Sequence, residues 1–553
     1  MGHKAYLLLW MGSLLVIGVS GAMFRDPGYM DAYYYYHVAA NLAAGRGLVE
    51  DVVWNYLAPV ETIPHASNLY WMPLTSFIAA PVMAAFGESF RAAQLPMIAI
   101  ASFAPPATAA VVWDMWRERW LALLSAGLTV FGGFYFHYWS AIDSFGIFAL
   151  AALLALWATG RLLMLDTRFH SEDRLPDHIP QLGSPIIIIR PLRSGEAMPP
   201  GTRRVPLDPW RANPINLGLL LGLGSGTAHL ARADGVLLLV ASVLALLLLR
   251  PAGWRPAVVG AVIGYTAVMG PWYLRTMAVT GSFTVPGSAA AMFLQDYNDL
   301  FSFNREFTLQ SYLGWGVGQI ILSKAHAFGE NLLTLHGAGL MLLPLSLVGA
   351  WVNRRDARLL PFFLYTGLVY LFLTVAFTFP GARGSMRHSG VALLPWSSLI
   401  CLLGIRATVG WLAPKRPHWR PAREEQGFSY IALGASAALS IAFLVYNAAV
   451  WDNELRRYQA VTAWLQYQDA GPAPIMVTDP PGFNYASGRR AVVTPSDGVD
   501  ALLAAADRFG VEYLALEAAH DPILQGLYTG AEQVGRLSHQ EWVGTTRMFK
   551  VVR

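Results

Sequence analysis

The chain has 553 residues, of which 55% are hydrophobic and only 13% are charged, whereas soluble domains carry about 25% charged residues. This composition excludes an ordinary soluble enzyme, a disordered protein and a fibrous protein. The net charge of +4 argues against a nucleic-acid partner, and the single cysteine, Cys401, excludes a disulfide framework and a thiolate metal site.

Apolar runs recur along the first 450 residues, and about 20 mostly apolar residues suffice to cross a bilayer. We therefore expect a multi-span α-helical membrane protein with about eleven spans plus interfacial helices. The spans are predicted at 5–24, 92–114, 120–139, 145–164, 214–230, 236–249, 256–276, 332–351, 360–379, 388–405 and 429–450. A shorter run, 72–86, contains Pro73 and Pro81 and is predicted to be re-entrant or interfacial.

Lys and Arg residues predict the orientation, because short cytoplasmic loops carry an excess of them. The N-terminus is expected in the cytoplasm and the membrane is expected to be the plasma (inner) membrane. The cytoplasmic loops are then the basic segments 116–119, 250–255, 353–358 and 406–423, together with the long loop 165–213.

The same orientation places the loops 25–91 and 277–331 and the polar tail on the outer side. In the tail, helix patterns at 453–468 and 498–509 alternate with strand patterns. The strands are predicted at 474–478, 491–494, 512–516 and 547–552. We therefore divide the chain into a transmembrane domain, 1–450, and a small extracytoplasmic α/β domain, 451–553.

Two aspartates stand at the starts of helices on the predicted outer side. Asp31 precedes the Tyr-rich run Tyr33–Tyr36, which has helix character and ends at Gly45, and Asp143 follows the third predicted span. Both positions suit a helix N-cap, so each aspartate is either a cap or a carboxylate that faces a substrate. An acidic group at this depth is costly unless it is solvated or used.

Two histidines of the first outer loop, His37 and His65, are weaker candidates. On the residues alone, His37 is interpreted as an interfacial histidine and His65 as a solvated loop histidine. His65 could instead hold a divalent cation together with the two aspartates, although no HxxxH or HxxE spacing supports such a site.

Four arginines lie at the outer ends of predicted spans: Arg232, Arg275, Arg383 and Arg387. Positive charge on the outer side runs against the orientation rule, and a guanidinium group binds phosphate oxygens in pairs. Together these residues are predicted to form a rim for an anionic head group. For Arg232, a local ion pair with Asp234 is the alternative.

Taken together, these features resemble the GT-C class of membrane glycosyltransferases, which use polyprenyl-phosphate-linked sugars. The class includes protein O-mannosyltransferases, lipid A aminoarabinose transferases and oligosaccharyltransferases. The motifs that carry the resemblance are Asp31 with Tyr33–Tyr36 and Gly45–Gly47, then Asn68–Leu74, Asp143, Leu230–Gly235, and Pro271–Arg275 with Gly281. The His-Pro-Pro run and the Trp-Trp-Asp-Tyr-Gly signature of two branches are missing, which favours transfer of a single sugar.

The resemblance implies an inverting enzyme that moves a sugar from a polyprenyl-phosphate donor to an acceptor hydroxyl on the outer face. It implies Asp31 as the general base and Asp143 as a second catalytic residue. The four arginines would bind the donor phosphate, and the implied substrate ligands are Tyr34, His37, His65 and Tyr70.

The resemblance implies no certain cofactor. It leaves open whether Asp31, Asp143 and His65 hold a divalent cation, Mg²⁺ or Mn²⁺. The implied partners are a polyprenyl-phosphate sugar, membrane lipid, and an acceptor glycan, lipid or protein. The alternatives are a transporter or flippase for a lipid-linked sugar, an oligosaccharyltransferase-like enzyme, and a non-catalytic scaffold.

Overall fold

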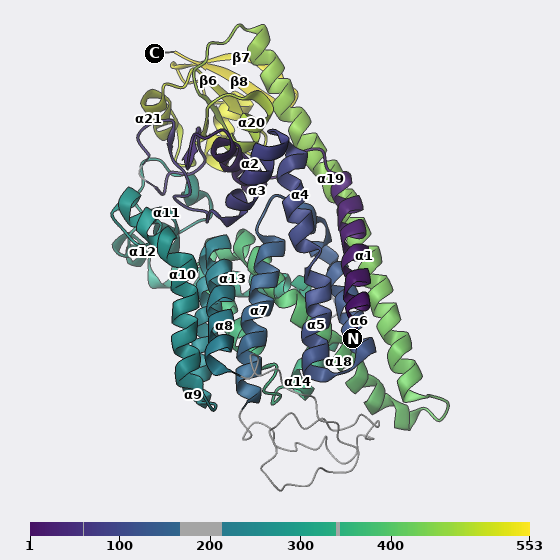
Figure 1. Ribbon diagram of the computed structural model, residues 1–553. Helices are drawn as coiled ribbons and strands as arrows, with labels where there is room; N and C mark the ends of the chain where they lie inside the picture. The colour runs from purple at the N-terminus through teal and green to yellow at the C-terminus, as the bar shows by residue number, and fades with distance from the viewer. Residues whose placement is uncertain (59, 166–212, 339–342, 553) are drawn as a thin grey trace.

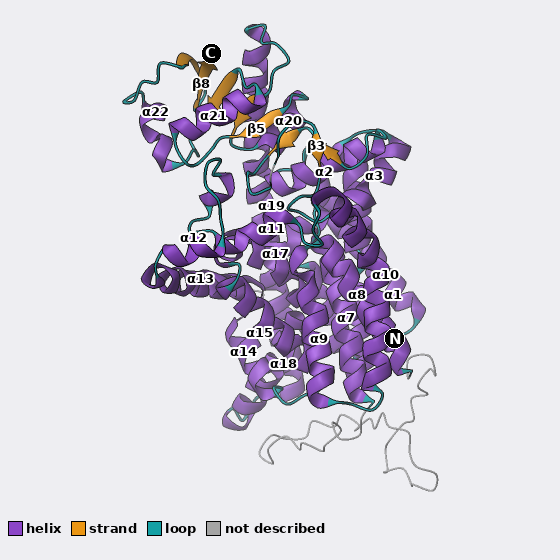
Figure 2. Cartoon of the chain, turned by 90° about the vertical axis from the view of Figure 1, so that its left-hand side faces the viewer, coloured by secondary structure: helices purple, strands orange, loops and turns teal. Residues whose placement is uncertain are grey.

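A computed structural model describes residues 1–58, 60–165, 213–338 and 343–552. A bundle of helices fills most of the molecule, and a mixed α/β layer covers one end of it (Figure 1). Figure 2 shows that the strands gather at this end, while the rest of the chain is helical. The predicted loop 165–213 lies almost wholly outside the described residues.

The bundle is built from apolar helices. Its first half comprises α1 (His3–Ala22), α4 (Phe90–Ala101), α5 (Ala104–Trp116), α6 (Arg119–Val130), the 3-10 helix η1 (Gly133–Ser140) and α7 (Phe145–Met164). Its second half comprises α8 (Pro214–Ala231), α9 (Val236–Leu249), α10 (Trp254–Thr280), α14 (Leu343–Val352), α15 (Leu360–Val375), α18 (Leu394–Leu412) and α19 (Pro421–Tyr467).

Within the described residues, six helices are long and apolar enough to cross a membrane, or up to seven if α6 and η1 count as one bent span. Three shorter apolar helices of 10–17 residues accompany them. Large apolar side chains are exposed along the outermost helices, for example Leu15 of α1 and Ile441 of α19, as expected where lipid is the solvent. The chain is therefore a multi-pass membrane protein, while the number of about eleven spans stays a prediction.

One predicted span differs from the structure. The segment 332–351 is not one span: it is divided between α13 (Val317–Ala338) and α14, and Figure 2 shows α13 lying across the bundle instead of along it. Lys324, Glu330 and other polar residues interrupt the apolar pattern of α13, which suits a helix at an interface. The run 72–86 forms a separate helix, α3 (Leu74–Phe86), beside α2 (Met30–Ala43).

The loop before α13 contains only short helices. They are α11 (Pro286–Ala290), α12 (Leu309–Gly314) and the 3-10 turns η4 (Ala291–Phe293) and η5 (Asn298–Phe301). Between α15 and α18 the chain forms α16 (Thr378–Pro380), the π-helical turn η6 (Gly381–Ser385), α17 (Met386–Gly390) and η7 (Val391–Leu393).

A six-stranded sheet forms the core of the outer layer, in the order β2-β5-β4-β6-β8-β7. Five strands come from the tail: β4 (Ile475–Val477), β5 (Ala491–Val493), β6 (Tyr513–Leu516), β7 (Leu537–Val543) and β8 (Thr546–Val551). Four of these match predicted strands; β7 does not. The helices α20 (Pro480–Ser487), α21 (Val499–Phe509) and α22 (Gln525–Thr529) complete the layer.

The sixth strand ties the first outer loop to the tail. β2 (Val52–Val53) lies parallel to β5, with Val52 opposite Ala491, and the short hairpin β1 (Val49–Glu50) and β3 (His65–Ala66) stands next to it in the chain. In addition, α19 runs without a break across the predicted boundary at residue 450. The tail is thus joined to the bundle by a continuous helix and by a shared sheet, which fixes the loop 25–91 in place.

Candidate active site

Asp31, Asp143 and His388 meet at the end of the bundle that faces the sheet. His388 Nε2 lies 3.2 Å from Asp143 Oδ2 and 3.6 Å from Asp31 Oδ2. One donor atom from each of the three residues falls within 4.8 Å of the others. The Asp143 side chain is 1% exposed, whereas that of Asp31 is 24% exposed, so a substrate can approach Asp31 more easily.

Neither aspartate is the N-cap of its helix. Tyr29 caps α2, and Asp31 lies in the first helical turn, where the helix dipole favours a carboxylate. Ser144 caps α7, and Asp143 lies one residue before it. The Asp143 carboxylate accepts hydrogen bonds from the hydroxyl of Tyr29 at 2.7 Å and from the hydroxyl of Ser144 at 3.0 Å. Asp143 is therefore held rigidly, while Asp31 keeps one side open.

The two carboxylates have different proton affinities. Burial raises the pKa of Asp31 to about 6, although the nearby charge of His388 works in the opposite direction. Burial would also raise the pKa of Asp143, but His388 and the hydrogen bonds from Tyr29 and Ser144 hold that pKa below its ordinary value. Two acids whose pKa values are pushed apart can play different roles, one fixed in charge and one able to take a proton near neutral pH.

His388 reaches the aspartates because the chain changes its helical repeat just before it. The turn η6 is a π-helix that leads directly into α17, and such turns are frequent at functional sites. A Cβ atom on Gly381 would lie 2.1 Å from the carbonyl oxygen of Leu373, so only glycine allows this turn to pack against the end of α15.

Three of the four predicted phosphate ligands surround this site. The Arg232 guanidinium is bonded to Asp234 at 3.1 Å, and its charge lowers the pKa of Asp31. Arg383 lies over the ring of Tyr297 at 4.5 Å, and Arg387 lies over the ring of Phe134 at 5.9 Å. Both of the latter side chains are exposed and leave the same short segment as His388.

Arg275 occupies a different place. It donates a hydrogen bond to the Ser67 carbonyl at 2.6 Å and stacks on Trp272 at 4.8 Å. The positive charge of Arg275 favours the ionised form of Glu50. The structure therefore separates Arg275 from the three arginines near Asp31.

The start of α2 is positioned by an aromatic contact with α19. Gly28 has φ = +93°, and a Cβ atom there would lie 2.2 Å from the Trp451 ring. The Trp451 ring in turn packs against Phe24 and Tyr29, at centroid distances of 4.4 and 5.3 Å. The left-handed turn at Gly28 lets the chain pass this ring and brings Asp31 to the site.

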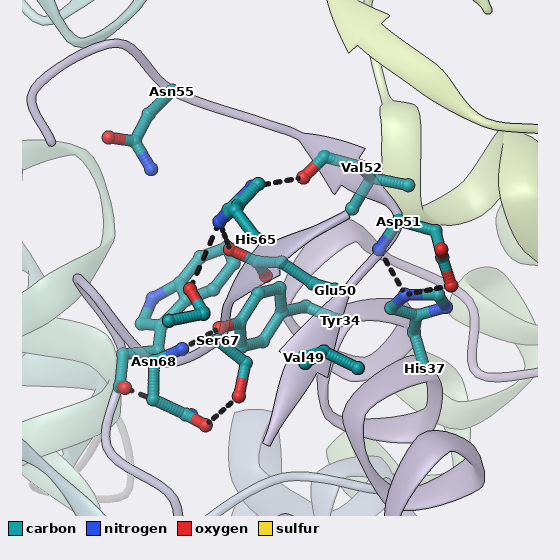
Figure 3. Close-up of polar contacts among 12 residues, drawn as sticks. Tyr34, His37, Val49, Glu50, Asp51, Val52, Asn55, His65, Ser67 and Asn68 are labelled. Atoms are coloured by element: carbon teal, nitrogen blue, oxygen red, sulfur yellow. Dashed lines mark hydrogen bonds and ion pairs between the residues drawn. The ribbon is translucent and has the colours of Figure 1, made fainter. Parts of the chain in front are cut away.

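His65 lies next to Glu50 (Figure 3), and the cluster with Asp31 and Asp143 contains His388 instead. Its Nδ1 is 3.4 Å from Glu50 Oε1, and its two ring nitrogens each lie 3.0 Å from a backbone carbonyl oxygen, that of Ala66 or Val52. The β1–β3 hairpin fixes this arrangement. The expected cation ligand His65 is therefore replaced by His388 in the cluster that the structure forms.

The other predicted substrate ligands of the loop also gather near Glu50, with one exception. The Tyr34 hydroxyl accepts a hydrogen bond from the Asn68 backbone at 2.7 Å, and Tyr70 lies on the same side, against Trp54. His37 instead accepts the backbone N–H of Asp51 at 3.0 Å. Burial lowers the pKa of His37 to about 4, so it is a neutral acceptor that shapes the loop.

The donor set of Asp31, Asp143 and His388 fits a divalent cation. Two carboxylate oxygens and one imidazole nitrogen already converge within 4.8 Å. An imidazole ligand favours Mn²⁺ or Zn²⁺ over Mg²⁺, which prefers an all-oxygen shell. The residues therefore allow a cation, and the same residues can also work as an ion pair and a base.

No family model matches the chain, and no curated protein sequence matches it. Solved structures do match. ArnT from Cupriavidus metallidurans bound to undecaprenyl phosphate is 12% identical over 99% of this chain and 98% of its own, with a TM-score of 0.51; its apo state gives 0.53. The oligosaccharyltransferase of Archaeoglobus fulgidus in complex with Zn and sulfate is 12% identical over 95% of this chain and 69% of its own, with a TM-score of 0.51. The chain therefore has the fold of these solved structures, so the resemblance is confirmed at the level of the fold.

Proposed function

We propose that the chain is a membrane glycosyltransferase that moves one sugar from a polyprenyl-phosphate donor to an acceptor hydroxyl. The observation that carries this proposal is the meeting of Asp31, Asp143 and His388 beside Arg232, within a fold shared with ArnT bound to undecaprenyl phosphate. Carboxylates that could take a proton lie next to guanidinium groups that could bind phosphate. A transferase of this kind needs both.

Asp31 is the proposed general base. As the acceptor oxygen attacks the anomeric carbon, its proton passes to the Asp31 carboxylate. The bond between the anomeric carbon and the phosphate oxygen breaks, and the polyprenyl phosphate leaves as an anion with the bonding electron pair. Attack from the face opposite the leaving group inverts the anomeric centre. A positioned base of this kind contributes about 10²–10⁴-fold to the rate.

The remaining charges have supporting roles. Arg383 and Arg387, whose side chains are exposed, would bind the phosphate, and Arg232 would stabilise the charge that develops on it. Asp143 and His388 act as positioning residues, because they orient each other and set the electrostatic environment of Asp31. If a cation binds to Asp31, Asp143 and His388, it would supply further positive charge for the leaving phosphate.

The location of this reaction follows from the predicted orientation, which places Asp31 and the sheet on the outer side of the plasma membrane. A flippase for the same lipid would share the arginines, but the solved structures with this fold are those of ArnT and of an oligosaccharyltransferase. This likeness supports the transferase over the transporter. An oligosaccharide donor remains the second candidate, because the fold is shared with an oligosaccharyltransferase.

The proposal predicts the pH dependence of the reaction. Asp31 must be deprotonated to accept a proton, and burial raises its pKa to about 6. We expect kcat/KM to be constant well above pH 6 and to fall about tenfold per pH unit below it. The measurement is the release of undecaprenyl phosphate from a radiolabelled undecaprenyl-phosphate hexose between pH 4.5 and 8.5. A flat profile down to pH 5 would contradict the assignment of the base.

The double variant Arg383→Ala/Arg387→Ala should weaken donor binding. Each charge-assisted bond to phosphate is worth about 1.5–3 kcal/mol, so the KM for the lipid-phosphate donor should rise at least about tenfold. The turnover number at saturating donor should change less. Arg490→Ala, an exposed arginine of the tail, serves as the matched control and should leave the KM unchanged. An unaltered donor KM in the double variant would remove the phosphate-binding role.

Chelation distinguishes the two uses of the cluster. If Asp31, Asp143 and His388 hold a required cation, incubation with EDTA should abolish turnover, and Mn²⁺ or Zn²⁺ should restore it better than Mg²⁺. If the cluster works as an ion pair and a base, EDTA should have no effect. We expect a metal-dependent enzyme to show equimolar metal by elemental analysis as well.

A further inference from the structure

The outer loop between α10 and α13 is bound to the tail at a point next to Tyr297. The Ser496 hydroxyl donates a hydrogen bond to the Asn298 carbonyl at 2.6 Å, and the Ser496 backbone N–H donates to the Phe301 carbonyl at 3.1 Å. The Asn298 amide donates to a carboxylate oxygen of Asp521 at 2.8 Å. Because Ser496 and Asp521 belong to the tail, this part of the loop is fixed to it from two sides. Figure 1 and Figure 2 show the loop, marked by α11 and α12, between the tail and the helical bundle.

Asp497 extends this attachment along the loop. Its two carboxylate oxygens accept hydrogen bonds from the backbone N–H groups of Phe303, at 3.1 Å, and of Asn304, at 2.7 Å. Hydrogen bonds to a charged group are about twice as strong as neutral ones. We refer to one set of contacts as the tail clamp, namely those of residues 298–304 with Ser496, Asp497 and Asp521.

Tyr297, which directly precedes the tail clamp, supports one of the proposed phosphate ligands. The Arg383 guanidinium lies over the Tyr297 ring at 4.5 Å, and a cation in this position is attracted by the ring. The pKa of Tyr297 is raised to about 12, mainly by burial and in part by the charge of Asp31, while the charge of Arg383 opposes this rise. Tyr297 therefore lies within electrostatic reach of both the proposed base and the phosphate ligand.

The loop also packs against the segment that carries Arg383. Leu300 is buried in an apolar cluster that Tyr297, Phe377 and Phe379 border, and Phe379 stands four residues before Arg383. The clamped residues and the start of η6 are therefore parts of one packed unit. A movement of the loop away from the tail would disturb the surroundings of Arg383 as well.

Arg387, the second proposed phosphate ligand of this segment, has a different support. It lies over the ring of Phe134 at 5.9 Å, and Phe134 belongs to η1 of the bundle. Both arginines are exposed. An exposed arginine has many rotamers, so a contact that fixes one rotamer before the ligand binds lowers the entropic cost of binding. The loop provides such a contact for Arg383, and the bundle provides it for Arg387.

We propose, on the basis of the function proposed above, that the tail clamp positions Arg383 for the donor phosphate. The clamp holds residues 298–304 against the tail, the loop holds the Tyr297 ring in place, and the ring holds the guanidinium. Ser496 and Asp497 are then positioning residues of the donor site, which act through Arg383 and not through Arg387. The tail thereby contributes to donor affinity from a distant part of the sequence.

The test is a double-mutant cycle on the binding of radiolabelled undecaprenyl phosphate to the purified full chain. We expect Ser496→Ala/Asp497→Asn to weaken binding about two- to fivefold, which corresponds to the loss of one exposed cation–π contact. In the Arg383→Ala background the same double change should have no further effect, whereas in the Arg387→Ala background it should keep its full effect. A merely structural defect would weaken binding in both backgrounds. Asp500→Asn, an exposed aspartate at the start of α21, is the matched control and should bind like the wild type.

Wild-type affinity in the double variant of the clamp would overturn the proposal, and so would a loss of the same size in the Arg383→Ala background. Ser496→Ala alone serves if the double variant does not fold, and a smaller loss in the same pattern is then expected. A failure of the proposed function would show differently: the wild type would not bind undecaprenyl phosphate, or Arg383→Ala would bind it as tightly as the wild type. Those results would remove the donor site and the inference with it, whereas normal wild-type binding that the clamp variant leaves unchanged would remove the inference alone.

Discussion

Asp31→Asn should lower the turnover of an undecaprenyl-phosphate hexose by about 10²–10⁴-fold. Asparagine has nearly the same shape as aspartate, but its amide cannot accept the proton of the attacking hydroxyl. Because Asp31 lies in the first turn of α2 with its side chain partly exposed, the fold should tolerate the change. The measurement is the rate of release of undecaprenyl phosphate at saturating donor and pH 7.5.

A matched control separates the loss of the base from a general charge effect. Asp452 forms ion pairs with Arg456 at 2.9 Å and with Arg25 at 3.7 Å, so Asp452→Asn should keep wild-type turnover. Donor affinity in Asp31→Asn should also stay within a few-fold of the wild-type value. Wild-type turnover in Asp31→Asn would show that a different group takes the proton.

His388→Gln should lower turnover by about 10²-fold, the cost of losing one preorganised charged group, and should also move the pH profile. Glutamine can still donate a hydrogen bond to Asp143, but it carries no positive charge. The charge of His388 lowers the pKa of Asp31, so its removal raises that pKa. The acid limb of kcat/KM should therefore move to higher pH, and less base should be available at pH 7.

The shift of the acid limb of kcat/KM is the decisive result for His388, because a purely structural role would reduce the rate without moving that limb. His520→Gln, in the tail, is the matched control; its ring faces Gln525 and the Glu517 carbonyl, and we expect an unchanged profile. If His388→Gln kept the wild-type acid limb, the electrostatic coupling between His388 and Asp31 would be disproved.

The two aspartates could be predicted from the sequence because an acidic residue next to a long apolar run is conspicuous. The same principle could have identified His388, which stands at the start of the predicted span 388–405, since ionisable residues at membrane depth are costly. His388 and Asp143 are 245 residues apart, and no local pattern indicates that they meet.

The elements that could not be predicted depend on tertiary contacts. β2 is only two residues long and exists because β5, from the far end of the chain, pairs with it. His65 does not join the two aspartates because the β1–β3 hairpin turns it toward Glu50. His388 takes that place in the cluster. The prediction of a span at 332–351 was wrong because hydropathy alone does not show that α13 lies across the bundle. By contrast, the helix α21 was predictable because Leu502, Ala505 and Phe509 repeat with helical spacing on its buried face.

Binding of a polyprenyl phosphate by the cluster around Asp31 is required by every step of the proposed reaction. This binding can be measured by mass spectrometry of lipids extracted from the purified protein, with undecaprenyl phosphate added during purification. We expect about one equivalent of polyprenyl phosphate or its sugar on the wild type, and a strong loss of it from Arg383→Ala/Arg387→Ala. Wild-type protein that retains no polyprenyl phosphate, or a double variant that retains as much as the wild type, would disprove this binding.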